Sequence, residues 1–135
     1  MAKSLYTTIS KKNPYYISKH RYLELKHFCL QYPEWKQRYA ELQDEIARSK
    51  YYISPKSCTD DHISELAIEM ASLREKMDLV ENTAREVDPV LGDYILKAVT
   101  RGCTYEFFQT QYDIPCCRDT FYDRYRKYFA FLNRQ

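Results

Sequence analysis

The chain has 135 residues, enough for one or two small helical units and too few for a large enzyme fold. Its 21 basic and 19 acidic side chains give a net charge of +2, which is not the overall charge of a strongly basic nucleic-acid-binding protein. Only Gly92 and Gly102 are glycine, so a glycine-rich phosphate-binding loop is excluded. The scarcity of glycine and the lack of clear period-two apolar runs predict an all-α fold.

Charge is distributed unevenly along the chain. Residues 1–50 carry a net charge of +5, residues 51–87 carry −4, and residues 88–135 carry +1. If the C-terminal part binds DNA, basic groups from the N-terminal part are therefore expected to add to the contact.

Catalytic and metal-binding patterns are lacking. None of the serines lies in a G-x-S-x-G sequence, and the three histidines fall in or beside predicted helices without the pattern of carboxylate and nucleophile that catalysis needs. The five cysteines include no C-x-x-C pair, and Cys58 with His62 would supply only two of the roughly four ligands that zinc requires. We therefore expect no enzymatic activity, no metal site and no cofactor. No signal peptide or long apolar segment is visible, which predicts a cytoplasmic protein with reduced thiols and no membrane contact.

Residues 1–17 are predicted to form a flexible basic arm, because lysines and the Asn13-Pro14 pair occur there without apolar periodicity. Residues 18–87 are predicted to form a helical bundle. Its first helix runs from the cap Ser18 to about residue 31, and its second begins at Pro33 and ends near residue 50. The apolar positions of these two helices are Tyr22, Leu25, Phe28, Cys29, Trp35, Tyr39, Leu42 and Ile46. Residues 51–59 are expected to be a linker.

The longest helical pattern spans residues 60–87. Its apolar residues alternate spacings of three and four, which is typical of a coiled-coil seam: Ile63, Leu66, Met70, Leu73, Met77, Val80, Ala84 and Val87. The helix at 33–50 could fold back on this seam as an antiparallel hairpin, and we favour that arrangement because its own apolar stripe also needs burial. A second chain could instead supply the partner, giving a homodimer through the 60–87 helix.

Residues 88–135 are predicted to form a trihelical unit. Asp88 would cap its first helix, which begins at Pro89 and ends near residue 101. The residues that this helix is expected to bury are Leu91, Ile95, Ala98 and Val99.

The last two helices are predicted to form a helix-turn-helix. Thr104 caps the first of them, which buries Tyr105, Phe108 and Tyr112. Pro115 then breaks the helical pattern, because it lacks an N–H group and disfavours helical geometry at the preceding residue. A recognition helix follows at about residues 116–132, with a buried stripe formed by Phe121, Tyr125, Tyr128, Phe129 and Leu132.

The run Asp-Thr-Phe-Tyr-Asp-Arg-Tyr-Arg-Lys at residues 119–127 resembles the C-terminal signature of small phage-encoded transcriptional regulators. These are the RinA-like and ArpU-like late activators, whose C-terminal part is similar to region 4 of bacterial sigma factors. The resemblance covers about the last thirty residues, and the matching positions are Thr120, Phe121, Tyr122, Arg126 and Lys127. It implies double-stranded DNA binding and transcriptional control, with RNA polymerase as a further partner.

The residues that we expect to contact DNA combine the basic positions of the last helix with its exposed hydroxyl groups, since these groups reach phosphates and base edges. They are Arg118, Thr120, Tyr122, Arg124, Arg126 and Lys127. Two alternatives remain open. A phage DNA-packaging factor, similar to a small terminase subunit, would also combine a helix-turn-helix with a coiled region, but would form a ring of many subunits. A helical protein-interaction module would bind no DNA.

Overall fold

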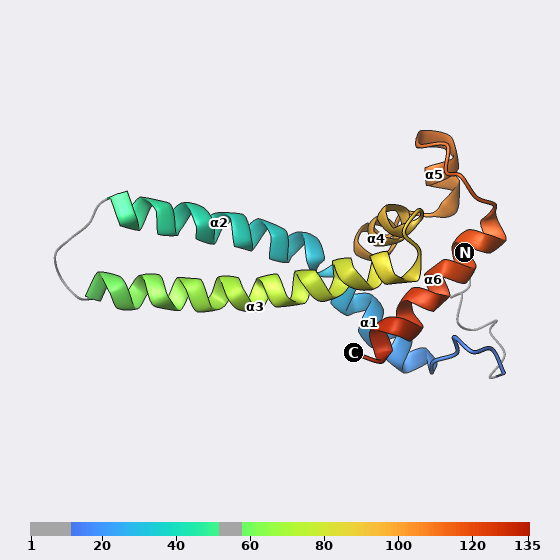
Figure 1. The fold of residues 1–135 in the computed structure, drawn as a ribbon, viewed down its shortest axis with the longest axis horizontal. Coiled ribbons are helices and arrows are strands. Elements are labelled where there is room, and N and C mark those ends of the chain that lie inside the picture. Colours follow the sequence, from blue (N-terminus) through green and yellow to red (C-terminus); the bar gives the residue numbers. More distant parts are fainter. Residues whose placement is uncertain (1–11, 52–57) are drawn as a thin grey trace. The chain divides into compact units, whose positions relative to one another are not determined.

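The computed structural model of the chain describes residues 12–51 and 58–135 (Figure 1). These residues form an all-helical structure without strands, which confirms the prediction of an all-α protein. The helices are α1 (Lys19–Leu30), α2 (Tyr32–Tyr51), α3 (Cys58–Val87), α4 (Gly92–Arg101), α5 (Tyr105–Gln111) and α6 (Arg118–Asn133). None of the described helices has both the length and the apolar character needed to cross a membrane. Most of the expected N-terminal arm, residues 1–11, and of the linker, residues 52–57, lies outside the described residues.

Helix α4 begins later than the sequence suggests. The carboxylate of Asp88 accepts hydrogen bonds from the backbone amides of Val90 and Leu91, at 2.9 and 3.0 Å. These bonds hold residues 88–91 in a turn, so Asp88 acts in a turn before the helix and not as its cap. The prediction that Pro89 is the first helical residue is therefore wrong, because the helix starts at Gly92.

The chain forms two compact units. One comprises the residues up to Gln31 together with Leu79–Gln135, and the other comprises Tyr32–Asp78. The sequence predicts a boundary at residue 88. The structure instead groups α1 and the last turns of α3 with the three C-terminal helices, because side chains of α1 and the backbone of α3 bond to α6. We call the first the α1–α6 unit and the second the α2–α3 unit.

Within the α2–α3 unit, α2 and α3 lie side by side and antiparallel (Figure 1). Arg38 of α2 donates two hydrogen bonds to Glu69 of α3, at 2.7 and 3.1 Å. Farther along, Glu45 lies 3.3 Å from His62. Apolar residues of both helices are buried along the same pair of helices: Trp35, Leu42, Leu66, Leu73 and Met77. Helix α2 therefore covers this part of the α3 seam.

The core of the α1–α6 unit is aromatic. Its largest fully buried side chains are Tyr128, Phe108, Phe121 and Phe129. Tyr22 of α1 packs edge-on against Phe129 of α6, with ring centroids 5.0 Å apart. The start of α4 approaches the end of α3 closely, since a Cβ atom on Gly92 would lie 3.1 Å from the carbonyl oxygen of Ala84. Glycine therefore permits a backbone approach that a larger residue would obstruct.

Residues 12–17 are structured, although the sequence predicts that they belong to the flexible arm. The Asn13 side chain accepts a hydrogen bond from the amide of Tyr15, at 2.8 Å, which forms a local turn. The turn leads to Ile17, which is only 6% exposed. Burial of this apolar side chain explains why the segment belongs to the fold. Ser18 then caps α1 as predicted, because its side chain accepts a hydrogen bond from the amide of Arg21.

Candidate nucleic-acid interface

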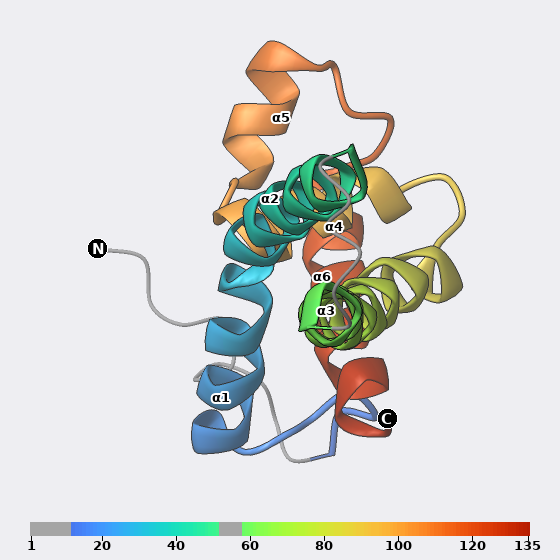
Figure 2. The same cartoon turned by 90° about the vertical axis from the view of Figure 1, so that its left-hand side faces the viewer.

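The break between α5 and α6 falls where the sequence places it. Asp113 adopts a left-handed conformation, with φ at 51°, and the following Ile114 is buried. The hydroxyl of Tyr105 donates a 2.7 Å hydrogen bond to the carbonyl of Cys116, which fixes the connection to the start of α5. Figure 2 shows this connection, residues 112–117, looping out before α6 begins. It is longer than the three or four residues of the common helix-turn-helix turn.

Helix α6 has the buried stripe that its sequence predicts, except that one of the five residues is partly exposed. Phe121, Tyr128, Phe129 and Leu132 are buried, while Tyr125 is intermediate. Helix α5 differs from its prediction at Tyr112, which is 50% exposed because the helix ends one residue earlier. The Tyr112 ring packs against the rings of Phe107 and Phe108. The ammonium group of Lys97 lies 4.5 Å from the centroid of the Tyr112 ring.

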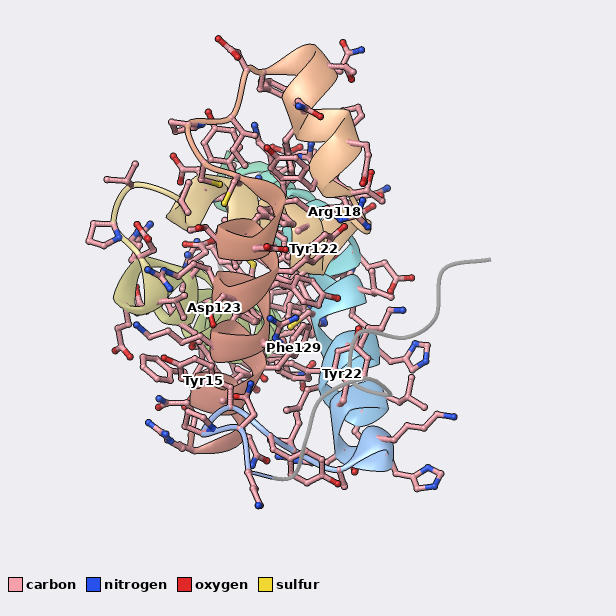
Figure 3. All side chains as sticks on the ribbon, turned by 90° about the vertical axis from the view of Figure 1, so that its right-hand side faces the viewer. Tyr15, Tyr22, Arg118, Tyr122, Asp123 and Phe129 are labelled. Atoms are coloured by element: carbon pink, nitrogen blue, oxygen red, sulfur yellow. The ribbon has the colours of Figure 1, made fainter. Side chains whose placement is uncertain are left out.

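Arg118 opens α6 and is exposed. Its guanidinium forms a 2.6 Å ion pair with Glu106 of α5. The same guanidinium lies 5.5 Å from the centre of the Tyr122 ring (Figure 3). The hydroxyl of Tyr122 in turn accepts a long hydrogen bond from the amide of Tyr105, at 3.5 Å. Arg118 and Tyr122 therefore hold α5 and α6 together. The exposed charge of Arg118 lies at the start of α6, directly after the connection at residues 112–117.

Arg124 has a different environment from the one that we expected of a DNA contact. Its Nε donates to the carboxylate of Asp88 at 3.2 Å, and a terminal nitrogen lies 2.5 Å from Asp123. These carboxylates raise the pKa of Arg124, chiefly through the hydrogen bond with Asp88. Its side chain is 32% exposed. The guanidinium therefore joins α6 to the turn before α4, which limits its availability to an external ligand.

The contribution of Asp88 to the free energy of unfolding should depend on pH. Partial burial opposes its ionisation, but hydrogen bonds from the amides of Leu91 and Val90 and from Arg124 outweigh this and lower its pKa. A lowered pKa in the folded state stabilises the fold above the unfolded-state pKa, and this stabilisation is lost as the pH falls through the folded-state pKa. We expect Asp88→Asn to reduce the free energy of unfolding at neutral pH, with a difference from the unmodified chain that shrinks below about pH 4.

Urea unfolding at several pH values measures this difference. The exposed Asp93 provides a matched control, and Asp93→Asn should produce no comparable pH-dependent difference. A deficit of Asp88→Asn that stayed constant down to about pH 3 would contradict the assignment.

Thr120 and the two adjacent cysteines lie at the start of α6. The hydroxyl of Thr120 lies 3.2 Å from the Cys117 sulfur, and this hydrogen bond is the main cause of the lowered pKa of Cys117. Burial instead raises the pKa of Cys116. Cys29 is deeply buried beside the Tyr128 hydroxyl, and burial raises its pKa to about 12. The Cys29 thiol is therefore protonated at neutral pH and serves as a core residue.

The remaining two candidate residues lie farther along α6. Arg126 and Lys127 are both partly exposed. The ammonium group of Lys127 lies 5.3 Å from the centre of the Phe131 ring. The structure thus places all six predicted residues on α6, with Arg118 and Thr120 in its first turn and Arg126 and Lys127 near its middle.

Sequence reasoning missed the contribution of α1 to this site. Arg21 donates a 2.7 Å hydrogen bond from Nε to the side chain of Asn133. The hydroxyl groups of Tyr22 and Tyr125 lie 3.0 Å apart. Helix α1 therefore lies along α6 (Figure 3). The apolar stripe of α1 could be recognised in the sequence, but such a stripe does not identify the helix that it contacts.

No group of three or more histidine, cysteine, aspartate or glutamate side chains in the described part of the chain is placed to hold a metal ion. The side chain of Cys58, one of the two weak candidates from the sequence, lies outside this part. Comparison of the chain with protein-family models, curated proteins and solved structures found no match.

Proposed function

We propose that the protein is a phage or prophage transcriptional regulator that binds DNA in a sequence-specific manner. In this proposal the α2–α3 unit is the N-terminal helical hairpin, and α4, α5 and α6 form a trihelical unit with a helix-turn-helix. Helix α6 lies in the major groove. Arg118, Thr120, Arg126 and Lys127 contact DNA, while Tyr122 and Arg124 border the contact and keep α6 in position.

One observation carries this proposal. Helix α6 buries an aromatic stripe on one side, while basic and hydroxyl-bearing side chains remain partly or fully exposed from its first turn to Lys127. A recognition helix needs both features, because the buried side fixes its orientation and the donors on the other side reach phosphates and base edges. The helix break at residues 112–117 supports the same arrangement, since the side chains of Arg118 and Asp119 at the start of α6 are exposed.

The proposal has consequences for partners. Double-stranded DNA is the main ligand, RNA polymerase is a second partner, and the protein acts in the cytoplasm. A homodimer formed through α3 would use the outer side of that helix, because α2 covers the seam in the α2–α3 unit. Ile68 lies on the outer side and is 70% exposed.

Substitution of the partly exposed basic residues of α6 tests the function. We expect Arg126→Ala and Lys127→Ala each to weaken binding to DNA fragments from the source genome by about tenfold, because each removes a donor to phosphate or base edges. Electrophoretic mobility shifts with the full chain measure the affinity, and circular dichroism checks that each variant is folded. Lys36→Ala, an exposed lysine of the α2–α3 unit, is the matched control. Unchanged affinity in both α6 variants would contradict the role given to this helix.

A further inference from the structure

The C-terminal helices do not carry the charge that DNA binding requires. Within the α1–α6 unit, residues 79–135 contain eight basic and eight acidic side chains, so their net charge is zero. Residues 12–31 contain four basic side chains and a single acidic one. The net positive charge of the described part of this unit therefore comes from α1 and the turn before it. Because neutralisation of phosphates supplies most non-specific DNA affinity, we expect α1 to supply much of the positive charge that contacts DNA phosphates.

Two cations of the C-terminal helices also form ion pairs with carboxylates. Arg118 pairs with Glu106, and Arg124 pairs with Asp88 and Asp123. A phosphate would have to compete with these carboxylates for the same guanidinium groups. The affinity gained from such a contact is smaller than that from a cation without a carboxylate partner.

Lys19 and Lys26 of α1 are in a different situation. Lys19 is exposed and Lys26 is partly exposed. Among the described residues neither lysine pairs with a carboxylate, and the ammonium group of Lys26 lies 6.0 Å from the centre of the Tyr22 ring. The two lysines are seven residues apart, so they lie on the same side of α1 and about 10 Å apart along its axis. We call this pair the α1 lysine row.

The α1 lysine row is held next to α6. The buried residues Tyr22, Leu25 and Cys29 form the adjacent stripe of α1. Tyr22 contacts both Tyr125 and Phe129 of α6. The position of the row relative to α6 is therefore set by packing within one compact unit.

From this charge distribution and packing, we propose that the α1 lysine row binds the phosphate backbone of the same DNA duplex that α6 contacts. This inference rests on the proposed DNA-binding function and adds a second contact surface to it. In this arrangement α1 supplies sequence-independent affinity through Lys19 and Lys26, while α6 supplies base contacts. The division corresponds to the general separation between contacts that position a protein on DNA and contacts that read its sequence.

The salt dependence of binding tests this proposal. The affinity of the full chain for a fluorescent duplex of mixed sequence is measured by anisotropy between about 50 and 200 mM salt. We expect the double variant Lys19→Ala, Lys26→Ala to bind about tenfold more weakly at the lowest salt, with a slope of log affinity against log salt that is shallower by about 1.8. The loss should be the same for duplexes of different sequence, because phosphate contacts carry no sequence information.

The matched control is Lys36→Ala, Lys76→Ala, which removes two exposed lysines that also lie over aromatic rings, in the α2–α3 unit. It should retain the affinity and slope of the unmodified chain. If the unmodified chain binds and the α1 double variant has the same slope, the role proposed for the α1 lysine row is overturned, while the function proposed for α6 stands. If the unmodified chain binds no duplex even at low salt, the proposed function is overturned and the lysine row with it.

Discussion

Replacing Tyr128 with alanine is expected to lower the free energy of unfolding by about 3–5 kcal/mol, as large-to-small substitutions of buried aromatic residues do. Tyr128 is fully buried in the α1–α6 unit and packs edge-on against Phe129, with ring centroids 5.2 Å apart. Its hydroxyl donates to the carbonyl of Val80 at 3.2 Å and lies 3.5 Å from the Cys29 sulfur. The substitution therefore removes ring packing and also the bond that joins α6 to α3. Urea unfolding followed by circular dichroism measures the change.

Two further variants separate the causes of this effect. Tyr128→Phe keeps the ring and removes the hydroxyl, so it should cost only about 1 kcal/mol. Tyr112→Ala removes a tyrosine that is half exposed, and it should cost well under the loss at Tyr128, because less apolar area is withdrawn from water there. Equal losses for Tyr128→Ala and Tyr112→Ala would show that the burial of Tyr128 has been misassigned.

A second large loss, also of about 3–5 kcal/mol, is expected for Phe108→Ala. Phe108 is the fully buried residue of α5, and its ring contacts Tyr94 of α4 at 5.4 Å and Phe121 of α6 at 5.7 Å between centroids. Since α5 has only seven residues, it depends on tertiary packing for its stability. Loss of this ring should loosen α5 in addition to lowering global stability. Hydrogen exchange of the α5 amides, measured together with urea unfolding, reports both effects.

The neighbouring Phe107 offers a control in the same helix. Its side chain is 42% exposed, so Phe107→Ala should change stability by about 1 kcal/mol or less. The helix propensity of the two variants is identical, because each introduces alanine into α5. A loss at Phe107 as large as the loss at Phe108 would mean that α5 packs through another face.

The helices of this protein could be predicted from local sequence patterns. The three-four spacing of apolar residues in α3 and the caps Ser18 and Thr104 each depend on residues within a few positions of one another. The break at Asp113-Ile114-Pro115 is equally local, because proline restricts the residue before it. These features are visible in the sequence since their physical causes act over one or two helical turns.

The tertiary partners could not be predicted in the same way. An apolar stripe on α1 predicts burial but does not specify that Tyr22 meets Tyr125, which lies 103 positions away in the chain. For the same reason, Arg124 was predicted to contact DNA, whereas the structure shows it bonded to Asp88. The start of α4 was misplaced because an aspartate before a proline is compatible with both a helix cap and a turn, and only the hydrogen bonds to Val90 and Leu91 distinguish them. Candidate surface residues are thus predicted less securely than core residues, because their role depends on distant neighbours.

The order of the compact units along the chain makes the α2–α3 unit an insertion. Residues 32–78 leave the α1–α6 unit after Gln31 and return to it at Leu79. The two points of departure and return are close, since Leu25 and Phe28 line one cavity together with Leu79 and Leu132. Lengthening or shortening the inserted helices by whole heptads would therefore preserve their seam and leave the aromatic core unchanged. A related chain with longer or shorter α2 and α3 helices would therefore keep the same α1–α6 unit, because residues 32–78 join that unit only after Gln31 and before Leu79.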